Sequence, residues 1–120
     1  MILVVDDNTL NRMILMKMIR HLGLTGHTAT NGSEAIQAVR EKPEINLVLM
    51  DLMMPVMDGF VATKNIRAFK SKEELAIVAV TADSSEGLLE KCLEAGCNEF
   101  ITKPIRKEEI EEVFKKYLTK

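Results

Sequence analysis

The sequence predicts a single-domain α/β fold over residues 1–120, in which helices cover both faces of a five-stranded parallel sheet. Short apolar runs and stretches of helical period alternate five times along these 120 residues. The strongest runs are rich in Val, Ile and Leu without polar alternation, which is typical of strands buried on both faces of a parallel sheet. The length is also that of one ordinary domain.

Three of the expected strands are uninterrupted apolar runs, at residues 2–5, 47–50 and 76–80. Two weaker strands complete the set. Residues 24–30 contain small and β-branched side chains, and residues 99–102 place two apolar side chains shortly before a proline.

Five stretches with apolar residues at helical spacing follow these strands. We expect helices over about residues 10–22, 33–40, 60–69, 88–95 and 107–118. The last has glutamates in its first turn and lysines in its last turn, which complements the helix dipole. Asp83 and Glu86, three residues apart, predict a capping box before the fourth helix.

The order of elements restricts the topology. Right-handed crossovers between strands require a parallel sheet with helices on both faces. Five strands in such a doubly wound sheet most often take the order 2-1-3-4-5, with a functional crevice at the carboxyl ends of strands 1 and 3. Residues that follow these two strands are therefore the first candidates for a site.

Composition excludes several classes of protein. A net charge of −2 gives no electrostatic footprint for direct nucleic-acid binding. The longest apolar run is residues 75–80, far short of the roughly 18 residues that cross a bilayer, so we expect no membrane span. Asp6 and Asp7 interrupt the first apolar run and leave no secretory signal, which favours the cytoplasm. Cys92 and Cys97 fit reduced, structural thiols.

Aspartates follow two strands that are predicted to be neighbours: Asp6 and Asp7 follow the first strand, and Asp51 follows the third. Three carboxylates within about 5 Å would repel by roughly 1 to 3 kcal/mol per pair, so a compensating cation is expected. Oxygen ligands of this kind suit Mg²⁺, which retains water and leaves room for phosphate oxygens. The alternative is that Asp6 and Asp7 only cap the first helix.

Two further side chains are predicted at the same edge of the sheet. Lys103 follows the fifth strand and Thr81 follows the fourth. An ammonium and a hydroxyl beside a metal-bound carboxylate supply the charge neutralisation and hydrogen bonds that phosphoryl transfer needs. Alone, Lys103 would be interpreted as a solvated surface lysine, but its place beside the acids favours a role in the site.

Four segments carry a resemblance to a known family: 4–8 (Val-Val-Asp-Asp-Asn), 49–59 (Leu-Met-Asp-Leu-Met-Met-Pro-Val-Met-Asp-Gly), 80–82 (Val-Thr-Ala) and 100–104 (Phe-Ile-Thr-Lys-Pro). In this order and spacing they resemble the CheY-like receiver domain of two-component response regulators, which has a flavodoxin-like fold. The likeness covers the whole chain. Finer matches at residues 11–12, 31–35 and 92–96 resemble receivers fused to hybrid histidine kinases.

The resemblance implies a phosphoacceptor signalling domain of a phosphorelay rather than a classical enzyme. Asp51 would take a phosphoryl group from a phosphohistidine on a histidine kinase or histidine phosphotransfer protein. The domain would catalyse this phosphorylation and its own dephosphorylation. Mg²⁺ would be held by Asp7 directly, by Asp6 through water, by the Asp51 carboxylate and by the backbone carbonyl of Met53.

The resemblance also implies a switch. Lys103 would pair with the phosphoryl oxygens, Thr81 would move to hydrogen-bond the phosphoryl group, and Phe100 would turn inward. The surface of the fourth helix, fifth strand and fifth helix would then change for partner binding. By itself, Phe100 would be a core aromatic residue. The Lys103-Pro104 bond resembles the family's cis peptide.

Three other functions remain open on the residues alone. A haloacid-dehalogenase-like phosphohydrolase would use an Asp-x-Asp motif, but Met53 occupies the place of the second acid. A flavin-binding domain would need phosphate donors after the first strand, where this chain is acidic. A receiver that serves only as an interaction module would not require the full set of acids, Thr81 and Lys103.

Several features have two interpretations. Asp83 either caps the fourth helix or tunes acyl phosphate hydrolysis, and Asp58 is expected in a turn. The methionines at positions 50, 53, 54 and 57 either pack the core and loop or form an adaptable docking patch. His21 and His27 lack paired ligand spacing and receive no role. The chain is either a standalone receiver or part of a hybrid sensor kinase.

Overall fold

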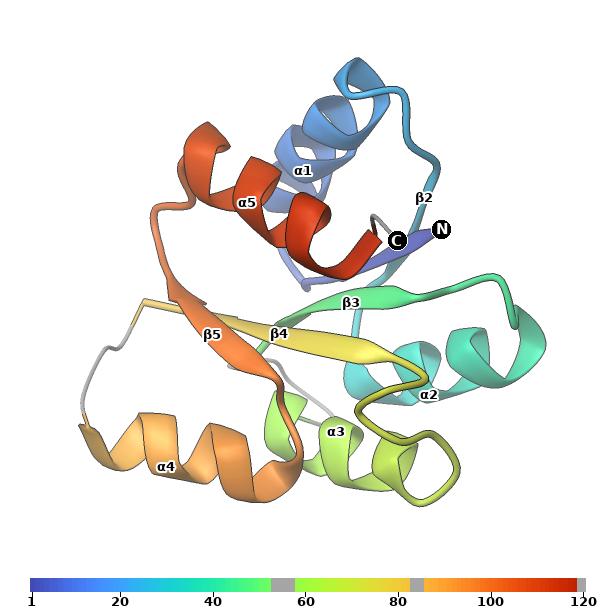
Figure 1. Cartoon of the computed structure of the whole chain (residues 1–120), viewed down its shortest axis with the longest axis vertical. Helices are drawn as coiled ribbons and strands as arrows, with labels where there is room; N and C mark the ends of the chain where they lie inside the picture. Colours follow the sequence, from blue (N-terminus) through green and yellow to red (C-terminus); the bar gives the residue numbers. More distant parts are fainter. Residues whose placement is uncertain (53–57, 83–85, 119–120) are drawn as a thin grey trace.

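The computed structural model describes residues 1–52, 58–82 and 86–118, and Figure 1 shows their arrangement. The strands are β1 (Ile2–Val5), β2 (Gly26–Ala29), β3 (Leu47–Asp51), β4 (Ala76–Thr81) and β5 (Glu99–Thr102). The helices are α1 (Thr9–His21), α2 (Gly32–Glu41), α3 (Gly59–Arg67), α4 (Glu86–Ala95) and α5 (Lys107–Leu118). All ten predicted elements are present, and their ends lie within two residues of the predicted ones.

The five strands form one parallel sheet in the order β2-β1-β3-β4-β5, which confirms the predicted doubly wound, flavodoxin-like topology. Helices α1 and α5 pack on one face, and α2, α3 and α4 pack on the other (Figure 1). None of the helices in the described ranges is long and apolar enough to cross a membrane.

Burial on both faces explains the uninterrupted apolar runs of the central strands. Along β1, Ile2 and Val4 join the core beneath α1 and α5, whereas Leu3 and Val5 join the core beneath α2, α3 and α4. Because every residue of β1 is buried, the sequence cannot alternate between apolar and polar side chains there.

The N-caps of two helices differ from what was expected for the aspartates near them. The N-cap of α1 is Asn8, whose side chain accepts a hydrogen bond from the Asn11 N–H at 3.1 Å. The alternative that Asp6 and Asp7 cap this helix is therefore wrong. Asp58, expected in a turn, is the N-cap of α3 and accepts from the Val61 N–H at 3.0 Å.

Two strands are one residue longer than predicted, and each added residue belongs to the candidate site. Asp51 is the last residue of β3 and pairs with Val80, while Thr81 is the last residue of β4 and pairs with Thr102. Parallel pairing thus extends past the apolar runs and holds both polar residues in the sheet.

Candidate functional site

The sheet register brings the three predicted aspartates to one edge. Val5 pairs with Met50, so the residues that follow them, Asp6 and Asp51, lie at neighbouring strand ends. One carboxylate oxygen from each of Asp6, Asp7 and Asp51 lies within 4.8 Å of the other two. Asp6 and Asp51 are buried, whereas Asp7 is exposed. The predicted cluster is therefore present, and it consists of two buried aspartates and one exposed aspartate.

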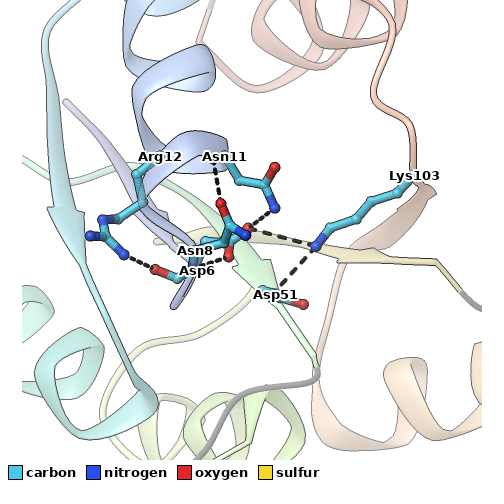
Figure 2. A network of polar contacts seen from close by, with 6 residues as sticks. All are labelled: Asp6, Asn8, Asn11, Arg12, Asp51 and Lys103. Atoms are coloured by element: carbon cyan, nitrogen blue, oxygen red, sulfur yellow. Dashed lines mark hydrogen bonds and ion pairs between the residues drawn. The ribbon is translucent and has the colours of Figure 1, made fainter.

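Lys103 bridges the two buried carboxylates (Figure 2). Its Nζ lies 3.5 Å from Asp51 Oδ2 and 3.6 Å from Asp6 Oδ2. The side chain of Lys103 is 27% exposed, compared with 4% and 6% for the two aspartates. One ammonium therefore offsets part of the repulsion between two charges that are shielded from water.

The backbone that carries Lys103 is tied to Thr81. The Lys103 N–H donates to Thr81 O at 2.7 Å, directly after the paired ends of β4 and β5. The Lys103-Pro104 peptide is cis, as the resemblance implied. Thr81 is buried at the end of β4 and Lys103 follows the end of the adjacent strand β5, so both residues lie at the same edge of the sheet.

Hydrogen bonds from the start of α1 hold Asp6 in place (Figure 2). The Asn8 N–H donates to Asp6 Oδ1 at 2.9 Å, and Asn11 Nδ2 donates to Asp6 Oδ2 at 3.2 Å. Arg12 Nη1 donates to Asp6 O at 2.7 Å and Arg12 Nη2 to Thr9 Oγ1 at 3.2 Å. Sequence reasoning gave these residues no role. The available signal was the spacing of two asparagines at a helix start, which is typical of a cap.

Of the other predicted site residues, Phe100 lies within the described part of the chain and Met53 does not. Phe100 is half-buried on β5, packs against the core beneath α2, α3 and α4, and lines a shallow hollow beside α5. Met53 lies outside the described residues, and so do Asp83, Met54 and Met57. Met50 is buried in the core and cannot join a docking patch in this fold.

The donor set of the cluster fits a hard cation. The described residues that meet here offer three carboxylates without a histidine or cysteine ligand. Such oxygen ligands suit Mg²⁺, Ca²⁺ or Mn²⁺, and three of them leave coordination positions for water or phosphate oxygens. The cluster could therefore hold a divalent cation next to Asp51.

Comparison with known proteins gives a consistent match. The family model of the response regulator receiver domain matches residues 2–115. Hybrid signal transduction histidine kinase G of Dictyostelium discoideum is 38% identical over 119 residues, which cover 97% of this chain. The match covers 3% of that kinase, so the chain spans a small part of this relative's length.

Two solved structures are similar over nearly the whole chain. The receiver domain of sensor histidine kinase PA1611 from Pseudomonas aeruginosa, with a magnesium ion coordinated in its active site cleft, has a TM-score of 0.88 and 33% identity. That match covers 99% of this chain and 97% of the other. The receiver domain of Saccharomyces cerevisiae Ssk1, crystallised with the phosphotransfer protein Ypd1, has a TM-score of 0.89 and 31% identity, and covers 97% and 86%.

The family match decides against two of the functional classes that the sequence left open. It favours a receiver domain over a phosphohydrolase or a flavin-binding domain, in agreement with the fold and with the aspartates at the predicted strand ends. The chain belongs to the response regulator receiver domain family of two-component signalling.

Proposed function

We propose that this receiver domain accepts a phosphoryl group on Asp51 from a phosphohistidine of a partner protein. The observation that carries the proposal is the placement of the buried Asp51 carboxylate, 3.5 Å from Lys103 and within reach of two further acids. A buried carboxylate at the carboxyl edge of the sheet, flanked by a cation, is suited to act as a nucleophile toward phosphorus.

The transfer exchanges one bond to phosphorus for another. A carboxylate oxygen of Asp51 forms a bond to phosphorus while the phosphorus–nitrogen bond of the phosphohistidine breaks. The bonding electron pair returns to the imidazole, which takes up a proton. The ammonium of Lys103 pairs with a phosphoryl oxygen and the hydroxyl of Thr81 donates to another, which stabilises the charge on the transferring group.

Asp6, Asp7, Asp51 and the backbone carbonyl of Met53 would hold Mg²⁺ at this site. When bound, the ion would neutralise the carboxylates and the phosphoryl oxygens. Both oxygens of Asp6 already accept hydrogen bonds, from Asn8 and Asn11, which favours contact with the ion through water. Asp7 is exposed and is better placed for direct coordination. The magnesium ion in the active site cleft of the PA1611 receiver supports Mg²⁺ as the ion.

Phosphorylation would act as a switch of surface shape. The acyl phosphate places a charge of about −2 and three strong acceptors next to Thr81 and Lys103. Movement of Thr81 toward these acceptors would open space behind it, into which Phe100 turns, and the α4-β5-α5 surface would change for partner binding. Hydrolysis of the acyl phosphate by water, catalysed by the same site, would release inorganic phosphate and reset the domain.

The protein that donates the phosphoryl group would dock on the exposed apolar residues of α1 next to the site. Leu10 and Met13 are each 63% exposed and Ile14 is 46% exposed, although all three are apolar. Ile14 also lines a hollow of about 430 Å³ that includes Asp6 and Lys103. Exposed apolar side chains that adjoin a reactive site are typical of a protein interface.

We propose a histidine phosphotransfer protein or a histidine kinase as the phosphodonor. The Ssk1 receiver was crystallised with the phosphotransfer protein Ypd1, and the Dictyostelium relative is a hybrid kinase. The chain would serve either as a separate receiver or as the receiver segment of a hybrid sensor kinase. The cytoplasmic location stays a prediction.

Incubation with phosphoramidate tests the proposed chemistry. The chain is mixed with Mg²⁺ and phosphoramidate, and intact mass spectrometry follows the adduct. We expect one phosphoryl group per chain, none with EDTA and none on Asp51→Asn. Asp58→Asn is the matched control, since Asp58 caps α3 and keeps an N-capping side chain after substitution, so it should react like the wild type. Equal adducts on wild type and Asp51→Asn would reject the proposal.

A further inference from the structure

Asn11 lies in the first turn of α1 and reaches the carboxylate cluster from the helix side (Figure 2). Its Nδ2 donates to Asp6 Oδ2 at 3.2 Å, and its backbone N–H donates to Asn8 Oδ1 at 3.1 Å. The Asn8 N–H donates in turn to Asp6 Oδ1 at 2.9 Å. The cap of α1 and the orientation of the Asp6 carboxylate are therefore fixed by the same set of hydrogen bonds.

The oxygen that Asn11 contacts is also the one that Lys103 approaches. Lys103 Nζ lies 3.6 Å from Asp6 Oδ2 and 3.5 Å from Asp51 Oδ2, so one ammonium is shared by two carboxylates. In the proposed reaction this ammonium pairs with a phosphoryl oxygen on Asp51 and is drawn away from Asp6. A buried carboxylate oxygen that loses a donor is destabilised. Asn11 supplies a neutral donor that stays in place.

We propose that Asn11 is a positioning residue for phosphorylation of Asp51. Its amide keeps the Asp6 carboxylate oriented and hydrogen-bonded, so that Lys103 is available to Asp51. Asn11 acts through Asp6 and Lys103 and does not touch the phosphoryl group. This role rests on the proposed function and adds to it a residue outside the acid, threonine and lysine set.

Helix α1 has anchors that do not depend on the Asn11 amide. Arg12 Nη1 donates to Asp6 O at 2.7 Å, and the Asn8 cap uses the Asn11 backbone rather than its side chain. Leu15 and Ile19 are buried beneath the helix. Removal of the amide should therefore leave α1 folded, and an effect on phosphorylation would arise at the site.

The test compares Asn11→Ala with Asn11→Gln, which keeps an amide, and with Asn65→Ala as a matched control. Asn65 Nδ2 donates to Val61 O at 2.9 Å on the exposed side of α3, away from the cluster. The rate of phosphoryl adduct formation with phosphoramidate is measured over a series of Mg²⁺ concentrations. In parallel, NMR follows the backbone amides of Asp6 and Asp7 during a Mg²⁺ titration without phosphodonor, and thermal unfolding is measured in EDTA.

We expect Asn11→Ala to form the adduct about five- to tenfold more slowly at saturating Mg²⁺, the factor for loss of one hydrogen bond of ordinary net strength. Its NMR titration midpoint should shift to higher Mg²⁺, while its unfolding temperature in EDTA stays near that of the wild type. Asn11→Gln should react at a rate between those of the wild type and Asn11→Ala. Asn65→Ala should match the wild type in all three measurements.

Equal rates and midpoints for wild type and Asn11→Ala would overturn the inference, and so would an equal loss in Asn65→Ala. An Asn11→Gln variant slower than Asn11→Ala would contradict it as well. A wild type that gives no adduct rejects the proposed function and this inference together. A reactive wild type with an unaffected Asn11→Ala rejects the inference alone.

Discussion

At the scale of single residues, a glycine sets how closely the backbone packs at Asp51. Gly59 begins α3, and its N–H donates to Leu52 O at 3.1 Å. A Cβ added to Gly59 would lie 2.5 Å from Asp51 O and 2.9 Å from Leu52 Cα, and both are backbone atoms that cannot move aside cheaply. The start of α3 can therefore approach the end of β3 only with glycine at this position.

Gly59→Ala tests this packing. The added methyl group should push the end of β3 away from α3, destabilise the fold by about 1 to 3 kcal/mol and slow phosphorylation of Asp51. Gly87→Ala is the matched control, because Gly87 lies in α4 and a Cβ there meets no atom within 4 Å. That substitution should stabilise by about 0.4 to 1 kcal/mol. Urea unfolding measures both free energies, and a Gly59→Ala chain as stable as the wild type would contradict the packing explanation.

The sequence predicted which acids meet but could not predict how they are held. Asp6, Asp7 and Asp51 could be placed because strand ends of a parallel sheet meet at one edge, which depends only on topology. The contacts of Asn8 and Asn11 with Asp6 depend on side-chain directions at the start of a helix. Spacing along the chain does not determine these directions, so the two asparagines received no role.

At the scale of elements, one arginine joins the segments that lead into β4 and β5. At the end of α3, Arg67 Nε donates to Gly96 O at 2.7 Å and Nη2 donates to Asn98 Oδ1 at 2.8 Å. Nη1 donates to three carbonyls of the connection between α3 and β4, those of Lys70, Ser71 and Leu75. Asn98 Oδ1 also accepts from the Ile77 N–H at 2.9 Å. These bonds fix the amino ends of both strands, opposite the carboxylate cluster.

Arg67→Ala should therefore loosen two elements at once. Loss of several hydrogen bonds to part-buried carbonyls should cost about 2 to 4 kcal/mol of unfolding free energy. Hydrogen exchange at the backbone amides of Ile77 and Asn98 should be faster in this variant than in the wild type. Arg40→Ala is the control, since Arg40 is exposed and contacts the Phe69 ring at 4.8 Å, a contact worth about 0.5 to 1 kcal/mol. Equal losses of unfolding free energy in the two variants would show that the hydrogen bonds of Arg67 contribute no more than the contacts of a surface arginine.

All ten elements were predicted from the sequence, and the largest error in a strand lies at the edge strand β2. The central strands β1, β3 and β4 are fully buried, and each predicted apolar run lies within its observed strand. The edge strand β2 is shorter than predicted, because two of its four residues are only partly buried, a third is exposed, and its pattern has no clear ends. The Arg67 contacts have no periodic signal at all, since a polar residue near a helix end ordinarily faces solvent.

At the scale of the whole molecule, the free energy of unfolding should depend on whether a cation is bound at the carboxylate cluster. A cation that binds only the native fold stabilises that fold by mass action. Cys92 and Cys97 are fully buried in the core beneath α2, α3 and α4, and burial raises the pKa of the Cys97 thiol to about 11. Both thiols should therefore stay protonated and inaccessible near pH 8 until the chain opens.

Thiol reactivity measures this opening. With a disulfide reagent such as DTNB at pH 8, both cysteines should react slowly and together, at a rate set by unfolding. Mg²⁺ at ten times its dissociation constant should slow the reaction about tenfold if opening is in rapid equilibrium. The slowing should be weaker in Asp7→Asn, which lacks one carboxylate of the cluster. Rapid labelling of one thiol, or no effect of Mg²⁺, would contradict the predicted linkage.

The identity of the phosphorylated residue is the most direct test of the central proposal. Borohydride reduces an aspartyl phosphate to homoserine, so peptide mass mapping of the reduced adduct locates the acceptor. After reaction with phosphoramidate and Mg²⁺, we expect homoserine at position 51 and aspartate unchanged at positions 6 and 7. Homoserine at Asp6 or Asp7, or a phosphoryl adduct that yields no homoserine, would contradict the assignment of Asp51 as the phosphoacceptor.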